Sequence, residues 1–343
     1  MNDHALMQRA VELSLLGRGL TCPNPIVGAV VASSSGEILA QGFHQGREHA
    51  EVLALRELEK IGSNHQDLTL FVTLEPCNHH GKTPPCTDAI LDIGVKFGIN
   101  RIIYATSDPN PLAQGGAKRL LESGMKVIQI DSPEARFANR DWLTKIRLGR
   151  PRITWKVAAS LDGAIAAADG TSKWITNEAS RADVKRERSL SDAIVTGTGT
   201  VLADDPSMLG STRNPVRIVM GERTIPANMK IHSDGAETIF IKSRESDDLL
   251  ALAEARGFNR IFLESGPTLG SALFQAGLVD EILLYQAPTL LGSDRRFTAG
   301  IALSGINQQI RLRSEEVAEF DGDIKRLLFL DTPINEEVSC SPA

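Results

Sequence analysis

The sequence contains few cysteines, and the four that it has are Cys22, Cys77, Cys86 and Cys340 in a chain of 343 residues. Four cysteines in a chain of this length do not make a disulfide framework, so they do not indicate an oxidising compartment. No apolar run approaches the roughly 20 residues that are needed to span a bilayer. Charged residues interrupt the apolar pattern of the N-terminal segment, which favours an amphipathic helix over a signal peptide. We therefore expect a cytoplasmic protein with no membrane partner.

The sequence also lacks a long run of basic residues. Lysine and arginine total 37 against 43 aspartates and glutamates, which gives a formal net charge of −6. Binding to a nucleic-acid backbone needs clustered lysine and arginine side chains, so nucleic acid is excluded as the main partner. Local basic residues can still hold a single phosphate group, and a small anionic ligand remains compatible with this composition.

The length of the chain suits two domains, and the predicted elements fall into two alternating groups. In the first group we expect a helix capped by Asp3, followed by alternating strands and helices that favour a three-layer domain around a sheet. The predicted strands are residues 26–33, 36–43, 68–76, 101–106 and 126–130, and the helices after the first cover residues 49–62 and 86–94.

A basic segment with a glycine and a proline, residues 145–152, is predicted to link the two groups. The second group again alternates, with strands predicted at residues 153–160, 193–198, 216–220, 238–242, 260–264 and 281–288. We place the domains at residues 1–147 and 148–332, with a flexible polar tail at 333–343.

The stretch TLEPCNHHGKTPPC, residues 73–86, carries two cysteines nine positions apart. Cys77 follows a predicted strand and Cys86 begins a predicted helix, while His49 lies at the start of an earlier helix. Helix N-termini that follow strands gather at one edge of such a sheet, so these three side chains are expected to converge. One imidazole and two thiolates suit zinc, and three protein ligands leave the fourth position open, as in catalytic sites.

Glu51 lies two residues after His49, where a carboxylate can transfer protons beside such a metal. Attack of water on a ring carbon needs a group that carries a proton to the departing nitrogen, and a carboxylate that does not bind the metal supplies it. Zinc-dependent nucleobase deaminases share the pattern H-x-E followed by P-C-x-x-C. Here HAE matches the first half, whereas the second half reads P-C-x8-C. A purely structural zinc, with His79 or His80 as its fourth ligand, is the main alternative.

The second group of elements contains two glycine-rich turns between a strand and a helix. One lies in ESGPTLGSAL (264–273), where backbone N–H groups at a helix start can face a diphosphate. The other is TGTGT (196–200), which is not the G-x-G-x-x-G fingerprint. Either turn alone is more simply interpreted as a βα turn without a ligand. Together they indicate a nucleotide site.

Four segments, PNPIVGAVV, HAEVLAL, TLEPCNHHGKTPPC and DPNP, closely resemble the deaminase half of the bifunctional riboflavin-biosynthesis deaminase/reductase family. The eight-residue spacer with HHG-x-TPPC separates that family from cytidine and tRNA adenosine deaminases. The resemblance implies a cytidine-deaminase-like fold, one Zn²⁺ per chain on His49, Cys77 and Cys86, and Glu51 as the proton shuttle. It also implies four substrate contacts, namely Asn24, His44, His79 and Lys82.

The second half carries the landmarks of the family's reductase, KVAASLDGAIA, SKWIT, TGTGTVLADDP and ESGPTLGSALFQAGLVDE, in the expected order. That reductase is similar in fold to dihydrofolate reductase, so the resemblance implies an α/β domain that binds NADPH. The implied cofactor contacts are Ala158, Trp174, Thr200, Asp204, Gly266, Pro267, Thr268, Leu269, Gly270, Ser271 and Ala272. The implied substrate contacts are Ser172, Arg188, Met208 and Glu264.

This chain departs from the family pattern in two places. After DDP the usual x-L-T-x-R is replaced by SMLGSTR, so the arginine arrives two positions late, as Arg213. Our hypothesis is that a longer loop returns Arg213 to the usual place, opposite Arg188, where it binds the substrate phosphate. The strand that usually ends in V-x-D-S reads VMGE here, with Gly221 and Glu222 in place of the aspartate and serine.

The resemblance implies a homo-oligomeric enzyme that catalyses two steps of riboflavin synthesis. The first is zinc-dependent hydrolytic deamination of 2,5-diamino-6-ribosylamino-4(3H)-pyrimidinone 5′-phosphate, and the second is NADPH-dependent reduction of the ribosyl chain to ribityl. One alternative is a deaminase with an impaired or vestigial reductase domain. A tRNA-editing deaminase is opposed by the acidic composition, and a zinc-stabilised scaffold without activity is opposed by the presence of Glu51.

Overall fold

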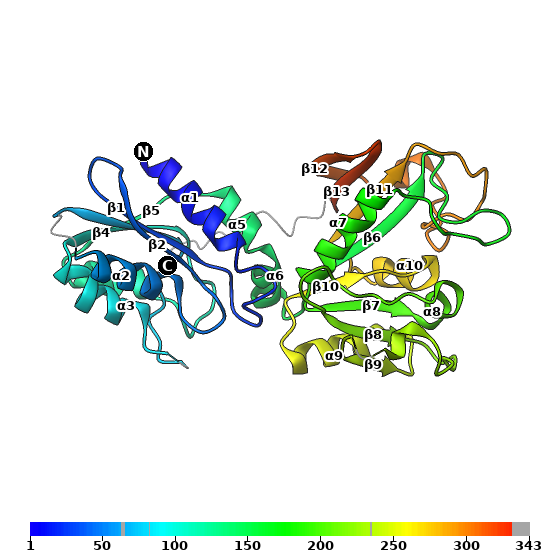
Figure 1. Cartoon of the computed structure of the whole chain (residues 1–343), viewed down its shortest axis with the longest axis horizontal. Helices are drawn as coiled ribbons and strands as arrows, with labels where there is room; N and C mark the ends of the chain where they lie inside the picture. The colour runs from blue at the N-terminus through cyan, green and yellow to red at the C-terminus, as the bar shows by residue number, and fades with distance from the viewer. Residues whose placement is uncertain (63–65, 82, 234, 331–343) are drawn as a thin grey trace. The chain divides into compact units, whose positions relative to one another are not determined.

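The computed structural model describes residues 1–62, 66–81, 83–233 and 235–330, and divides the chain into two compact units. The first comprises Met1–Pro151 with Glu254–Asn259, and the second comprises Arg152–Ala253 and the residues from Arg260 onward (Figure 1). Lys82 and the predicted tail at 333–343 lie outside the described residues. Within the described part of the chain, no helix is long and apolar enough to cross a membrane.

The first unit is built on a five-stranded sheet in the order β2-β1-β3-β4-β5. β1 is antiparallel to both β2 and β3, whereas β3, β4 and β5 run parallel to one another. All seven residues of β3 are buried, as expected for a central strand covered on both faces. The strands are β1 (Gly28–Ala32), β2 (Ile38–Phe43), β3 (Leu68–Leu74), β4 (Ile99–Thr106) and β5 (Lys126–Gln129).

Helices cover both faces of this sheet, which confirms the predicted three-layer arrangement. Along β1 the side chains alternate between two cores, with Val30 packing toward one face and Val31 toward the other. α1 (Asp3–Leu15) and α5 (Pro133–Ala138) lie on the face of Val30. The face of Val31 is covered by α2 (Ala50–Ile61), α3 (Cys86–Ala89), the π-helical turn η1 (Ile90–Gly94), α4 (Gly116–Glu122) and α6 (Arg140–Leu148).

Two local predictions in this unit are wrong. The cap of α1 is Asn2 and not Asp3, because the extended Asn2 accepts a hydrogen bond from the Ala5 amide at 2.9 Å. The predicted linker at 145–152 is helical in its first half, since α6 continues to Leu148 and ends at Gly149 in the left-handed region. Two basic residues of that segment, Lys145 and Arg147, lie in the last turn of α6, where they complement the helix dipole. Only Gly149–Pro151 therefore separates α6 from β6.

The second unit contains an eight-stranded sheet in the order β12-β13-β11-β6-β10-β7-β8-β9. The six strands from β11 to β9 are parallel, and β13 and β12 extend the sheet in antiparallel fashion. The strands are β6 (Arg152–Ser160), β7 (Ala193–Gly197), β8 (Val216–Met220), β9 (Thr238–Ile241), β10 (Arg260–Leu263), β11 (Glu281–Ala287), β12 (Leu312–Phe320) and β13 (Asp323–Leu330).

The helices that lie wholly or mostly in the second unit are α7 (Glu178–Ser189), α8 (Thr198–Asp204), α9 (Ser246–Arg256) and α10 (Pro267–Gln275), with 3₁₀ turns η2 (Lys230–His232) and η3 (Ile306–Gln308). All six predicted strands are present. Strands β12 and β13 were not predicted, because the β12 residues are mostly exposed and carry no apolar pattern. The parallel order brings the carboxyl ends of β6, β10, β7 and β8 to the same edge of the sheet.

The close approach of α1 to β1 generates a stability prediction. A Cβ atom added at Gly28 would lie 1.9 Å from the Ala10 carbonyl oxygen and 2.8 Å from the Ser14 nitrogen, both backbone atoms that cannot move alone. We expect Gly28→Ala to lower the free energy of unfolding by about 1–3 kcal/mol or more. Urea unfolding of the full chain measures this change.

The matched control is Gly94→Ala in the same unit, where the new methyl group meets its nearest neighbour, Leu55 Cδ2, at 3.4 Å. This control should keep the free energy of unfolding within about 1 kcal/mol of the parent. Equal stability of the two variants would contradict the observed packing of α1 on β1.

Candidate metal centre and reductase site

The three predicted metal ligands lie where chain segments enter or leave regular structure on one face of the first sheet. His49 is the extended residue immediately before α2, and Cys86 is the first residue of α3. Cys77 follows the end of β3 by three residues, and its sulfur accepts a hydrogen bond from the Cys86 amide at 3.3 Å. The ends of α2, α3 and β3 thus bring the three side chains together as predicted.

The ligand atoms are close enough together for all three to bind one zinc ion. His49 Nδ1 lies 3.0 Å from Cys86 Sγ and 3.5 Å from Cys77 Sγ, and all three atoms lie within 4.8 Å of one another. In tetrahedral zinc sites the ligand atoms are about 3.5–3.8 Å apart, given the usual zinc–sulfur and zinc–nitrogen distances. Neither His79 nor His80 belongs to this group of atoms, so the described cluster has three protein ligands.

The cluster favours a thiolate even without an ion. The hydrogen bond between the two thiols, together with that to His49, lowers the pKa of Cys77 to about 4. The same bond, with burial, raises the pKa of Cys86. The hydrogen bond with Cys77 raises the pKa of His49. One negative sulfur held beside a second thiol and an imidazole is a donor set that attracts a soft cation.

Glu51 lies beside the cluster in the first turn of α2, with only 3% of its surface exposed. Burial raises the pKa of its carboxyl group, and that group contacts the Cys86 thiol. A carboxyl with a raised pKa near a metal can accept a proton and later give it up.

Among the predicted substrate contacts in this unit, His44 lies beside the metal cluster. The His44 ring lies 5.3 Å from the His49 ring, and its Nδ1 bonds to the Glu48 carbonyl at 2.8 Å. Within the described part of the chain, His44 Nε2 and His79 Nδ1 are buried atoms without a hydrogen-bond partner. Burial lowers the pKa of His44, which favours its neutral form. Asn24 is exposed in the loop before β1.

Two acidic residues next to this site were missed by the sequence analysis. Glu75 is buried after β3 and accepts the amide hydrogens of Asp108, Gly115 and Ala117 at 3.0–3.2 Å. It thereby holds the loop that follows β4 against the end of β3. Burial raises the pKa of Asp108 to about 6. Their positions, each just beyond a neighbouring parallel strand, were a signal that the sequence already contained.

In the second unit the structure joins two predicted substrate contacts, Arg188 and Glu264, in a bidentate ion pair. The Arg188 Nε and Nη2 atoms lie 2.5 and 2.9 Å from the two carboxylate oxygens. Lys156 on β6, which sequence analysis missed, lies 3.7 Å from the same carboxylate. Burial opposes the charged form of Glu264, but the two cations outweigh it and lower its pKa. The sequence contained a signal for Lys156 as the third member of this charged cluster, because a lysine is unusual within a buried strand such as β6.

The structure also brings the two glycine turns together. The Gly266 amide, at the start of α10, donates to the hydroxyl of Thr200 in α8 at 3.2 Å. The Ser172 hydroxyl donates to Asp204 at the end of α8, at 2.8 Å. Trp174 is 70% exposed, with the Arg181 guanidinium 4.7 Å from its ring. Cofactor contacts predicted from separate segments are thus adjacent around α8.

The other predicted contacts in the second unit are buried or lie within regular secondary structure. Gly270 packs against Trp155, where an added Cβ would lie 2.2 Å from the ring atom Cζ2. Ser271 and Met208 are each only 2% exposed, and Met208 has a positive φ of 54°. Ala158 lies within β6 opposite Tyr285. The remaining predicted contacts are in the first turns of α10, namely Pro267, Thr268, Leu269 and Ala272.

The side chain of Arg213 is hydrogen-bonded to backbone carbonyls at the C-terminal end of α7. Its Nε donates to the Ser189 carbonyl at 3.2 Å, and its Nη2 donates to the Ser191 carbonyl. Among the described residues, no partner contacts Nη1. The loop after Asp205 therefore returns the arginine to the helix that carries Arg188, but it uses two of the three guanidinium nitrogens to hold backbone oxygens.

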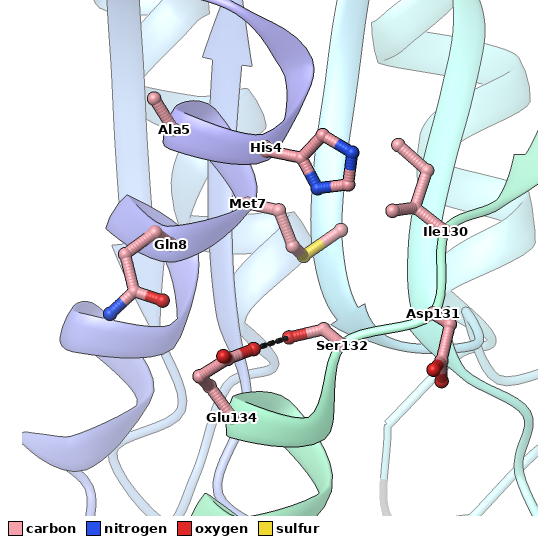
Figure 2. A pocket seen from close by; sticks show the side chains of 8 residues that line it. All are labelled: His4, Ala5, Met7, Gln8, Ile130, Asp131, Ser132 and Glu134. Carbon is pink, nitrogen blue, oxygen red and sulfur yellow. Dashed lines mark hydrogen bonds between the residues drawn. The ribbon is translucent and has the colours of Figure 1, made fainter.

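A hollow of about 330 Å³ lies on the opposite face of the first sheet from α2 and α3 (Figure 2). It lies between α1 and the segment that joins β5 to α5, and the Ser132 hydroxyl donates to Glu134 at its edge. Its lining contains no residue of the metal cluster, and consists of His4, Ala5, Met7, Gln8, Ile130, Asp131, Ser132 and Glu134.

Each half of the chain matches the model of a known protein family. Residues 1–106 match the cytidine and deoxycytidylate deaminase zinc-binding region, and residues 151–325 match the RibD C-terminal domain. These matches confirm the predicted fold class, a cytidine-deaminase-like domain followed by a dihydrofolate-reductase-like domain.

Similar proteins extend over nearly the whole chain. The riboflavin biosynthesis protein RibD of Mycobacterium tuberculosis is 40% identical over 329 residues, covering 93% of this chain and 94% of the relative. RibD of Escherichia coli is 40% identical over 340 residues, covering 86% and 90%.

A solved structure of a diaminohydroxyphosphoribosylaminopyrimidine deaminase/5-amino-6-(5-phosphoribosylamino)uracil reductase from Thermotoga maritima superposes with a TM-score of 0.86. It is 30% identical and covers 95% of this chain and 98% of its own. A structure of Acinetobacter baumannii RibD gives a TM-score of 0.84 at 35% identity, with 96% and 99% coverage.

The ligand geometry predicts the metal content of the purified protein. We expect one zinc per chain, and we expect Cys77→Ser to lose most of it, because a hydroxyl replaces a thiolate ligand. Elemental analysis of the parent and the variant measures the occupancy. Cys22→Ser, a cysteine outside the cluster, is the matched control and should keep the parental zinc content. Full occupancy in Cys77→Ser would exclude this ligand set.

Proposed function

The chain belongs to the RibD family of riboflavin-biosynthesis proteins, and from this premise we propose how its residues divide the chemistry. It is a bifunctional enzyme, a deaminase joined to a reductase. In our proposal the first unit deaminates a diaminohydroxyphosphoribosylaminopyrimidine, and the second reduces the ribosyl chain of the resulting 5-amino-6-(5-phosphoribosylamino)uracil. The observation that carries the proposal is the convergence of His49, Cys77 and Cys86 beside the buried Glu51.

In the deaminase unit His49, Cys77 and Cys86 would hold the zinc ion. When bound, zinc supplies a Lewis acid that makes water acidic enough to act at neutral pH. Glu51 accepts a proton from the attacking water and delivers it to the ring amine, so that a C–O bond forms, the C–N bond breaks and ammonia leaves. The raised pKa of its carboxyl group suits this double role.

The substrate in this unit would be oriented by the two unpartnered imidazole nitrogens, His44 Nε2 and His79 Nδ1. Both are buried polar atoms, and a ligand that bonds to them relieves the cost of leaving them unpaired. Asn24 and Lys82 remain predicted contacts, and Lys82 lies outside the described residues.

In the reductase unit NADPH would lie over the carboxyl ends of β6, β10 and β7. When bound, it supplies the hydride. The turns at Gly266 and Thr200, which are joined by the bond from the Gly266 amide to the Thr200 hydroxyl, would face its diphosphate, and Trp174, Ala158 and Asp204 would border the same edge. The other predicted cofactor contacts are those in the first turns of α10.

The substrate of the reductase would meet Arg188, Ser172 and the Lys156–Glu264 pair. Burial lowers the pKa of Lys156, so it gives up a proton more readily than an exposed lysine, and Glu264 orients it. A buried carboxylate with two cationic partners favours an active reductase over the alternative of a vestigial domain, because such a cluster is costly to retain without a use.

Glu51→Gln tests the deaminase chemistry. The amide cannot carry a proton, so ammonia release should fall by roughly 10²–10⁴-fold or more, while zinc stays bound. Reduction of supplied deaminated product with NADPH should not change, because that site lies in the other unit. Glu59→Gln, an exposed glutamate on the same helix, should leave both activities at the parental level. Near-normal ammonia release by Glu51→Gln would rule out this mechanism.

Arg213→Ala tests the phosphate contact. Two anchored nitrogens leave Nη1 of Arg213 available for a phosphate oxygen, so we propose that it holds the 5′-phosphate of the reductase substrate. Loss of such a bond costs about 1.5–3 kcal/mol, which is about 10–150-fold in kcat/KM for NADPH oxidation. Lys185→Ala, which removes an exposed charge from α7, is the control. Unchanged kcat/KM together with reduced stability in Arg213→Ala would show that the arginine only caps α7.

A further inference from the structure

The chain after β8 faces the same glycine turn that lies at the start of α8. β7 and β8 are parallel neighbours, with Gly197 paired to Met220 at their carboxyl ends. The next residue, Gly221, has a φ of +128°, and an added Cβ there would lie 2.6 Å from the hydroxyl oxygen of Thr198. The Gly221–Arg223 segment therefore begins in direct contact with the first residue of α8.

Arg223 turns back over this turn. Its Nη1 atom lies 3.7 Å from the position that a Cβ atom on Gly199 would occupy, so the guanidinium lies at the first turn of α8. Arg223 is exposed, and among the residues that the structure describes it makes no hydrogen bond or ion pair. Most of the other arginines near this sheet edge are occupied, since Arg188, Arg213 and Arg217 bond to a carboxylate or to backbone carbonyls.

The strand order says which part of a dinucleotide this segment would meet. Contacts proposed for the cofactor come from β6, from the turn after β10 and from the turn after β7, and β8 is the next strand in the sheet. A dinucleotide that lies across these ends in order would bring its adenosine ribose to the end of β8. In α/β nucleotide sites an acidic residue at such a position bonds to the ribose 2′-hydroxyl of NADH, whereas an arginine accommodates the 2′-phosphate of NADPH.

This chain has both kinds of residue, because the exposed Glu222 immediately precedes Arg223. We propose, resting on the proposed reductase function, that Arg223 is the residue that recognises the 2′-phosphate, and that Glu222 weakens the preference for NADPH over NADH. The guanidinium bonds to the phosphate dianion, and the adjacent carboxylate repels it. The two side chains together set the cofactor preference of the reductase.

Binding measurements on the full-length, zinc-loaded protein test this proposal without relying on turnover. Calorimetric titration gives dissociation constants for NADPH, for NADH and for adenosine 2′,5′-bisphosphate, a fragment that keeps the 2′-phosphate and lacks the nicotinamide half. The variants are Arg223→Ala and Glu222→Gln. The control is Arg244→Ala, which removes an exposed arginine beyond β9, one strand further along the sheet.

We expect Arg223→Ala to weaken NADPH and the bisphosphate by roughly 10–100-fold, because a charge-assisted bond is lost, and to leave NADH unchanged. Glu222→Gln should tighten NADPH about 2–10-fold. Arg244→Ala should change neither cofactor. Unchanged NADPH affinity in Arg223→Ala, or an equal loss for NADPH and NADH, would overturn the assignment of Arg223. If the parent binds neither cofactor, the proposed reductase function fails, and this inference fails with it.

Discussion

Parallel strands bring the residues that follow them to one edge of a sheet, and both sites of this protein depend on that geometry. In the first unit the segment after β3 supplies Cys77 and Glu75, and the loop after β4 supplies Asp108. In the second unit the segments after β10 and β7 supply Glu264 and the two glycine turns. The strands are buried and rigid, so the polar groups at their ends are held in position by the core and not by the loops themselves.

Glu51 and Glu264 show how the surroundings of a glutamate set its role in each unit. No cationic side chain among the described residues is bonded to Glu51, so burial dominates and raises its pKa, which suits a group that takes up and releases a proton. Burial also acts on Glu264, whose side chain is 11% exposed, but Arg188 and Lys156 neutralise the charge, and its pKa is lowered. It therefore stays ionised and holds two cations in fixed positions. The same side chain acts as a proton carrier in one unit and as a fixed charge in the other.

Arginine side chains shape the loops around the reductase edge. Arg217 is almost fully buried on β8 and donates to the carbonyls of Ser207, Ser233 and Ala236, while Arg213 donates to the end of α7. These bonds give the unusual SMLGSTR loop a defined course, because each buried carbonyl needs a donor. Gly221 removes the side chain that would collide with Thr198, and so permits the close path of the residues after β8.

The sequence by itself determined the chemistry of the first site and the order of most elements. The spacing of His49, Cys77 and Cys86 around strand ends, and the alternation of apolar segments, are local patterns that report residue type and periodicity. Only the tertiary structure decided which side chains bond to one another. Arg188 and Glu264 are 76 residues apart and meet because β10 lies beside β7. Lys156 joins them from β6, and Asn2 rather than Asp3 caps α1. Such contacts depend on strand order and side-chain packing over long separations, which no local pattern contains.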